Sequence, residues 1–172
     1  MTERPTIDEL FGRCVSSAVH LEMRDMYTPE DPTYLDWKSG VNYDPVERFR
    51  DWYDLMVRTV ARGVRVRRAR IVSEPITDFI RHEFETTPAL NLPAGEEVRW
   101  LGRSRASDLA LPGNDFWVFD EKLVRFGLFA GDGTYLGQQI SENPSVVRLC
   151  LAAFDAVWER AVDHDDYQPA WV

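Results

Sequence analysis

Six arginines are crowded into residues 58–70, a stretch with no acidic residue and no lysine. They are Arg58, Arg62, Arg65, Arg67, Arg68 and Arg70. A guanidinium group binds a carboxylate or a phosphate through two parallel hydrogen bonds, so the cluster predicts a site for an anionic small molecule or an acidic partner. The alternative is internal pairing, in which carboxylates from the acidic flanking segments neutralise the arginines. The sequence leaves both interpretations open.

Two further polar groups follow predicted strands. Glu74 and Asp78 are four residues apart, which places them on one side of a short helix that also carries Arg81. Asn114 and Asp115 stand at the head of a strongly apolar strand, where polar groups border a cleft. For Glu74 the alternative role is to cap the short helix. The candidate ligand-binding or partner-binding residues are Arg65, Arg67, Arg68, Arg70, Glu74, Asp78, Arg81, Asn114 and Asp115.

The histidines His20, His82 and His164 do not have the spacing of a helical zinc motif, and no Cys-x-x-Cys occurs. A catalytic His20 would need Glu22 or Asp25 to orient its ring. Residues two apart do not face each other on a helix, so the pattern favours an ion-pair cluster at a helix end. We expect no metal site.

The sequence lacks the local motifs of common catalytic centres: a Gly-x-Ser-x-Gly nucleophile elbow, a Walker loop and a dinucleotide fingerprint. Cys14 and Cys150 lie in apolar patterns, which predict buried thiols of the core rather than nucleophiles. The sequence therefore assigns no catalytic residue and no cofactor, and it leaves open whether the protein is an enzyme.

The elements that must position these residues begin with helices. A capping box at residues 6–9, followed by apolar residues at helical spacing, predicts a helix over 6–27. A second helix starts at Asp44-Pro45-Val46-Glu47, and Gly63 is placed to end it in a left-handed conformation.

Strands follow the second helix. Residues 64–72 form the first, with a β-bulge expected near Arg67-Arg68 because the apolar alternation changes phase there. A short helix and four more strands precede a last helix that starts at Asn143-Pro144. The strands are predicted at 64–72, 96–100, 115–120, 123–129 and 134–140.

These elements predict a single α+β (mixed α/β) domain. A helical N-terminal part over 1–63 packs on a mixed, mainly antiparallel five-stranded sheet, which spans 64–162 together with the C-terminal helix. An acidic tail over 163–172 is expected to be frayed.

The charge and composition of the chain argue against several classes of function. Twenty Lys and Arg against 29 Asp and Glu give a formal net charge of −9, which opposes direct binding to nucleic acid or to an anionic membrane. The sequence has no uninterrupted apolar run of about 18 residues, and two cysteines are too few for a disulfide framework. These features predict a cytoplasmic location.

Four stretches resemble an actinobacterial family of uncharacterised proteins, whose members are often encoded beside helix-turn-helix regulators. The stretches are Val64-Arg-Val-Arg-Arg-Ala-Arg-Ile-Val-Ser-Glu-Pro75, Val98-Arg-Trp-Leu101, Leu111-Pro-Gly-Asn-Asp-Phe-Trp-Val-Phe-Asp120 and Val146-Val-Arg-Leu-Cys150. The resemblance covers nearly the whole chain. It implies a helix-turn-helix regulator as a partner, without implying a reaction.

The order of elements from 64–72 to the last helix is also similar to half of a phospholipase D-type domain. Active members of that superfamily carry His-x-Lys-x-x-x-x-Asp on the strand that opens the hairpin. The resemblance places Gly113 at the His, Asp115 at the Lys and Asp120 at the final Asp. It therefore implies a degenerate domain without phosphohistidine chemistry, similar to ligand-sensing modules of some transcription regulators.

Two hypotheses follow. The leading one is a non-catalytic regulatory or interaction module that senses a ligand and acts with a DNA-binding regulator. The alternative is a small biosynthetic or detoxifying enzyme that performs acid–base chemistry on an anionic substrate. A deep apolar pocket lined by Trp100, Trp117 or Phe119, next to a carboxyl group of raised pKa, favours the enzyme. A flat arginine-rich face favours the interaction module.

Overall fold

The structure, a computed structural model, describes residues 5–171. The helices and strands follow in this order: α1 (Ile7–Arg13), β1 (Ser17–Glu22), α2 (Pro32–Lys38), α3 (Pro45–Arg48), α4 (Arg50–Ala61), β2 (Arg65–Val72), α5 (Asp78–Thr86), β3 (Glu97–Gly102), β4 (Phe116–Phe119), β5 (Leu123–Phe129), β6 (Tyr135–Ser141), α6 (Pro144–Arg160) and β7 (Val162–Asp163). Short 3-10 helices lie at Arg103–Ala106 and His164–Asp166.

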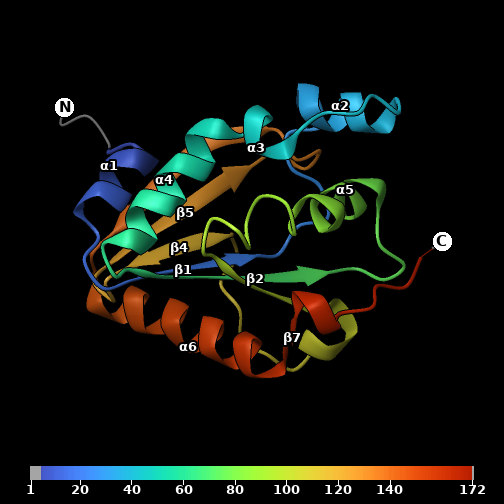
Figure 1. Cartoon of the computed structure of the whole chain (residues 1–172). Helices are drawn as coiled ribbons and strands as arrows, with labels where there is room; N and C mark the ends of the chain where they lie inside the picture. Colours follow the sequence, from blue (N-terminus) through green and yellow to red (C-terminus); the bar gives the residue numbers. More distant parts are fainter. Residues whose placement is uncertain (1–4, 172) are drawn as a thin grey trace.

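The described residues form one seven-stranded sheet in the order β6-β5-β4-β1-β2-β3-β7. Strands β1, β2 and β3 run parallel, and the other neighbouring pairs are antiparallel. In Figure 1, α6 covers one face of the sheet, and α1, α4 and α5 lie on the other. The predicted α+β class is confirmed, but the predicted count of five strands is wrong because β1 and β7 were not expected.

Strand β1 replaces the second half of the helix predicted over 6–27. The capping box at Thr6 is present, but α1 ends at Arg13 and residues 17–22 form the centre of the sheet. A central strand is buried on both faces, so its apolar residues do not alternate cleanly with polar ones. In this segment tertiary packing therefore overrides a pattern that a helix also satisfies.

Strand β2 has no bulge, contrary to the prediction. It pairs in unbroken register with β1 from Arg65 to Arg70 and with β3 from Arg67 to Val72. The apolar residues of β2 switch from one face of the strand to the other along its length, because helices pack against both faces of the sheet. Val66 packs in the cluster under α1 and α4, whereas Ile71 packs in the cluster under α6.

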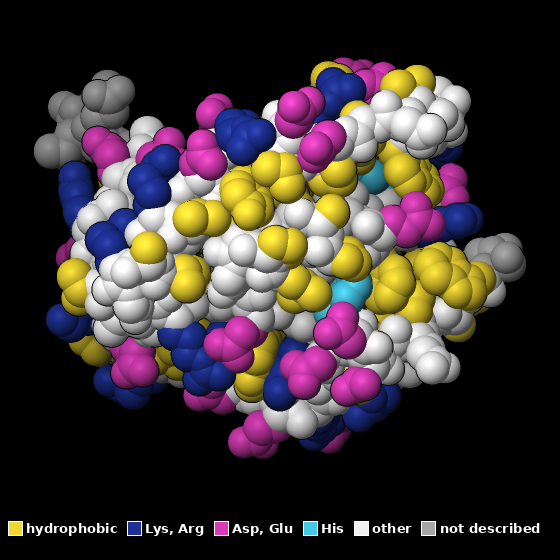
Figure 2. Space-filling model, in the orientation of Figure 1, with side chains coloured by type: hydrophobic (Ala, Val, Ile, Leu, Met, Phe, Trp, Pro, Cys, Tyr) yellow, Lys and Arg dark blue, Asp and Glu magenta, His cyan; other side chains and the backbone are white. Residues whose placement is uncertain are grey.

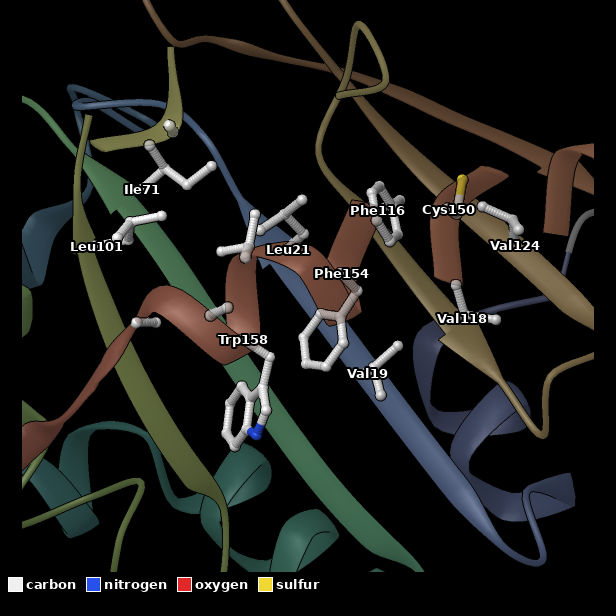
Figure 3. Close-up of a cluster of buried hydrophobic side chains, with 14 of the residues drawn as sticks. Val19, Leu21, Ile71, Leu101, Phe116, Val118, Val124, Cys150, Phe154 and Trp158 are labelled. Atoms are coloured by element: carbon white, nitrogen blue, oxygen red, sulfur yellow. The ribbon is translucent and has the colours of Figure 1, made fainter. Parts of the chain in front are cut away.

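The core on the α6 face is the largest cluster of buried apolar side chains. Phe154 and Trp158 of α6 point toward the sheet beside Val19 and Leu21 of β1 (Figure 3). Each such side chain stabilises the fold by about 1.5–3 kcal/mol when buried. The apolar side chains of α6 therefore fill the space between this helix and the centre of the sheet.

The segment after α6 is ordered, contrary to the expected frayed tail. Val162–Asp163 pairs with β3, and Nε of Arg99 donates to Oδ1 of Asp163 at 2.7 Å. The Tyr167 ring stacks on Trp100, with 5.7 Å between ring centroids. Aromatic packing on the edge of the sheet thus offsets the conformational entropy that this segment loses when it is ordered. The acidic composition of the segment did not indicate this packing.

Candidate functional site

A row of side chains crosses four strands on the sheet face opposite α6. The register pairs Arg125 of β5 with Trp117 of β4, Trp117 with His20 of β1, and His20 with Arg68 of β2. Because alternate residues of a strand share a face, the next polar residues on this face are Glu22 of β1 and Arg70 of β2. These two rows form the floor of the site.

Glu22 is the centre of a buried ion-pair network on this floor. It accepts from Nη1 of Arg68 at 2.5 Å and from Nε of Arg70 at 2.5 Å. Nε of Arg68 also donates to Glu96 at 2.9 Å. Burial alone would raise the pKa of Glu22, but the charges of Arg70 and Arg68 outweigh it and hold that pKa well below its usual range. Glu22 is therefore ionised at neutral pH.

Glu83 of α5 is the incompletely paired member of the network. Its Oε1 lies 3.5 Å from Nη2 of Arg70, while Nη1 of Arg70 donates to Thr87 at 3.0 Å. Its Oε2 is buried and has no hydrogen-bond partner. Burial raises the pKa of Glu83 to about 7, and the negative charge of Glu22 adds to the effect.

A cavity of about 430 Å³ lies between these rows and the helices α4 and α5. Aromatic side chains make much of its wall: Tyr27, Phe49, Trp52, Phe79 and Trp117. Arg68, Arg70, His20, His82 and Glu83 are among its polar lining residues. An apolar cavity of this size with a few convergent polar groups is typical of a small-molecule site.

Three buried polar atoms of the cavity lining lack a hydrogen-bond partner in the described chain: Nδ1 of His20, Nδ1 of His82 and Oε2 of Glu83. The His20 ring stacks on Trp117, with 4.2 Å between centroids, and its Nδ1 lies 3.6 Å from Glu22. Burial lowers the pKa of His20 well below its usual value, so the ring is neutral. Buried polar atoms are nearly always paired, so these three mark positions for atoms of a ligand or water.

A second lobe of about 320 Å³ shares His20, Glu83 and Trp117 with the cavity and adds Asp115. Asp115 accepts from the backbone N–H of Met23 at 2.9 Å and from the hydroxyl of Tyr27. Burial raises the pKa of Asp115 to about 6. The two lobes together therefore present two carboxyl groups whose pKa values lie near neutrality.

The structure brings three of the nine sequence candidates to this site: Arg68, Arg70 and Asp115. The two arginines donate to internal carboxylates, as the internal-pairing interpretation describes. Trp117, named from the sequence as a possible lining residue, lines both lobes.

Arg65 and Arg67 alternate with these arginines and face the α6 side. Nε of Arg65 donates to Glu97 at 2.6 Å, and the Arg67 guanidinium lies 5.0 Å from the Phe154 ring centroid. On the face shown in Figure 2, basic and acidic side chains lie side by side along the margins, and hydrophobic side chains gather between them. That face carries mixed charge rather than a continuous basic surface.

The remaining candidates lie elsewhere on the surface. Glu74 accepts from the hydroxyl of Tyr167 at 2.7 Å. Asp78 lies 3.5 Å from Lys38, and Arg81 pairs with Glu85 one helical turn away at 2.8 Å. Asn114 is exposed ahead of β4. The described lining of the cavity contains none of these four residues. The structure therefore does not bring Glu74, Asp78, Arg81 or Asn114 to the candidate site.

Sequence reasoning missed Glu22, Glu83 and Trp52 as site residues. His20 and Glu22 were expected not to face each other because residues 17–22 were read as helical. In a strand, residues two apart share a face, so the same spacing brings them together. Recognising strand alternation in this segment is the signal that would have found them.

Residues 5–171 contain no group of three or more His, Cys, Asp or Glu side chains arranged to hold a metal ion. None of their helices is both long enough and apolar enough to span a membrane.

A family model described as "Domain of unknown function (DUF6879)" matches residues 5–169. The chain belongs to the DUF6879 family. This match confirms the predicted resemblance to a family of uncharacterised proteins. No curated protein shows significant sequence similarity to this DUF6879 chain.

Solved structures share the fold. The phospholipase D family member Nuc from Salmonella typhimurium matches with a TM-score of 0.50 and 12% identity over 91% of this chain and 86% of Nuc. TrmBL2, an archaeal chromatin protein whose structure shows a novel mode of DNA binding, matches with a TM-score of 0.50 and 15% identity over 90% of this chain. The DUF6879 chain covers 47% of the length of TrmBL2, about half of that protein. The predicted likeness to a phospholipase D-type domain is confirmed for the fold.

Proposed function

We propose that this DUF6879 protein is a regulatory domain that binds a small organic molecule in the cavity beneath α4 and α5. The observation that carries the proposal is the cavity itself, with aromatic walls and three buried polar atoms without partners. The arginine cluster serves the site indirectly: Arg68 and Arg70 build a rigid charged floor rather than an exposed anion-binding surface.

The regulatory part of the proposal rests on fold and charge. TrmBL2, a DNA-binding protein, contains a region of this fold that makes up about half of its length. This chain has a net charge of −9, which opposes direct contact with DNA. We therefore propose that it acts in the cytoplasm on a separate DNA-binding regulator, such as a helix-turn-helix protein encoded nearby in an actinobacterial genome.

Thermal unfolding in the presence of single metabolites tests the binding. Amino acids, amines, nucleosides, sugars and carboxylic acids are added one at a time at millimolar concentration. A ligand raises the Tm of the wild type. Ile7→Trp, which places an indole at the cavity wall, abolishes that shift, whereas Leu149→Trp on the exposed side of α6 preserves it. Equal shifts in both variants would place the ligand outside the cavity.

Co-purification tests the regulatory part. The chain is expressed with a helix-turn-helix protein from its genomic neighbourhood, and the complex is measured with and without the ligand. A complex whose affinity changes with ligand supports regulation. The absence of a complex at micromolar concentration contradicts it.

A second candidate function is acid–base catalysis. It is favoured by Glu83 and Asp115, which share the second lobe and have pKa values raised to about 7 and about 6. Two carboxyl groups that titrate near neutral pH can exchange protons with a substrate. Conversion of a bound metabolite, followed by NMR, would establish catalysis if Glu83→Gln abolishes it and Glu85→Gln does not.

A further inference from the structure

The charge around the cavity is unbalanced toward the negative. Five carboxylates line it or bind its floor: Asp31, Glu83, Glu22, Glu96 and Asp115. Three guanidinium groups face them: Arg68, Arg70 and Arg125. Arg68 is shared between Glu22 and Glu96, so its charge is already compensated. A positively charged ligand would complete this set, and a second anion would add to the excess.

Glu83 is the member of this set whose buried oxygen has no hydrogen-bond donor in the described chain. Its Oε1 makes the 3.5 Å contact with Arg70, and its Oε2 makes none although it is buried. The Glu83 side chain is 19% exposed, so bulk water reaches it only in part. A buried carboxylate oxygen without a donor costs free energy until an N–H group reaches it.

Apolar surface lies next to this oxygen. Phe79 and Glu83 are four residues apart on α5, and both line the cavity, so they lie on one face of the helix. Tyr27 packs near Phe79, with 5.9 Å between ring centroids. Rings in this cavity already hold a cation, since the Arg68 guanidinium lies 5.5 Å from Trp52 and 5.4 Å from Trp117.

We infer that the cavity takes a small organic cation, an amine or amidine with an apolar body, whose N–H groups donate to Oε2 of Glu83 while its body packs against Phe79 and Tyr27. This inference deepens the proposed function and rests on it. A cavity of about 430 Å³ accommodates such a molecule.

Three probe molecules of nearly identical shape but different charge separate the effect of charge on affinity from the effect of shape. Benzamidine is a cation, benzamide is neutral and benzoate is an anion. Isothermal titration calorimetry of the full chain measures each Kd. Benzamidine is expected to bind at least about tenfold more tightly than benzamide, the size of one charge-assisted hydrogen bond, and benzoate is expected to bind more weakly still.

Matched variants assign the preference to Glu83. Glu83→Gln keeps the shape and removes the charge, so it is expected to bring the benzamidine Kd close to that of benzamide. Glu85→Gln, two residues along α5 and exposed, is expected to leave all three Kd values unchanged. Phe79→Leu is expected to weaken all three probes by a similar factor, because it removes ring contact without changing charge.

The outcomes distinguish this inference from the proposed function. If benzamide or benzoate binds in the cavity as tightly as benzamidine, or if Glu83→Gln keeps the preference, the cation inference is overturned and the ligand-binding function stands. If no probe binds, the cation inference is also overturned, and the metabolite panel with Ile7→Trp decides the proposed function independently. Tighter benzamidine binding that Glu83→Gln removes supports both.

Discussion

Glu83 and Arg70 form a loose ion pair, with 3.5 Å between Oε1 and Nη2. The same guanidinium makes its short contact with Glu22, at 2.5 Å. Arg70 therefore stabilises one carboxylate fully and the other only in part. A carboxylate buried in this way lowers the stability of the protein without a ligand. Residues that do so are typical of binding sites rather than of structural ion-pair networks.

Glu83→Gln is expected to stabilise the protein at pH 8. The folded-state pKa of about 7 lies above the ordinary value of 4.5, so the free energy of unfolding falls as the pH rises from about 4.5 to about 7, and the loss is complete above pH 7. Removing the charge is expected to raise the free energy of unfolding at pH 8 by about 1–3 kcal/mol. At pH 4.5 the gain is expected to be largely lost, because the carboxyl group is protonated in the folded protein. Urea denaturation at both pH values measures it, and a destabilised variant at pH 8 would contradict it.

Benzamidine affinity is expected to rise with pH up to about 7 and then level off. The cation binds ionised Glu83, so the affinity falls by up to about tenfold per pH unit below the pKa. The charged groups around Glu83 are Arg70 and Arg68 of β2, Glu22 of β1 and Asp115 ahead of β4, and Asp115 adds a weaker dependence near pH 6. Calorimetry from pH 5 to pH 8 gives the profile. Glu83→Gln should flatten it, and an unchanged slope in that variant would assign the titration to another group.

Glu22→Gln is expected to destabilise the fold severely. The carboxylate is buried between Arg68 and Arg70, and removing its charge leaves two buried guanidinium groups without their shared partner. Breaking a buried ion pair in this way costs about 3–5 kcal/mol. Its matched control is Glu97→Gln, which removes the exposed pair with Arg65 and should cost less than about 1 kcal/mol. Equal losses in chemical denaturation would contradict the central role of Glu22.

Stability is also expected to fall in acid through Glu22. Its folded-state pKa lies below the ordinary value, so its contribution is present above about pH 4.5 and is lost as the pH falls toward the folded-state value. Glu22→Gln should weaken this acid dependence, measured as the free energy of unfolding between pH 3 and pH 6. An acid profile identical to that of the wild type would contradict the prediction.

Cys14 and Cys150 are expected to be unreactive in the native protein. Burial raises the pKa of each thiol to about 11, and for Cys14 the hydrogen bond to Asp120 adds to the effect. The thiolate is the reacting species, so alkylation by iodoacetamide at pH 8 should be far slower than in the urea-unfolded chain. Mass spectrometry of the modified thiols measures both rates. Rapid labelling of either thiol in the folded protein would show that it is not a core residue.

The predictable parts of the fold are those whose signals are local. The hairpin of β4 and β5, the turn to β6 and the Asn143 cap of α6 follow from turn chemistry and capping. Strand β1 is different because its partners β2 and β4 come from distant segments. No residue within 17–22 indicates those neighbours, and a run buried on both faces satisfies a helical pattern as well as a strand.

The candidate site follows the same division. The sequence predicts a bulge near Arg67-Arg68, and only the unbroken register of β2 in the structure places Arg65 and Arg67 on one face and Arg68 and Arg70 on the other. The partner of Arg70 is not visible, because Glu22 lies 48 positions away. Site residues in this fold come from strands and helices that only the sheet topology brings together, so the arginine spacing alone predicts neither the floor nor the cavity.

The most direct test of the ligand-binding cavity is the set of indole N–H signals in a ¹H–¹⁵N NMR spectrum during a benzamidine titration. Trp52 and Trp117 line the cavity, whereas Trp158 packs under α6 on the opposite sheet face and Trp171 is exposed near the C-terminus. Saturable shifts are expected at Trp52 and Trp117, with Trp158 and Trp171 unmoved. Shifts confined to Trp158 or Trp171, or no saturable shift at any of the four, would contradict binding of an organic cation in this cavity.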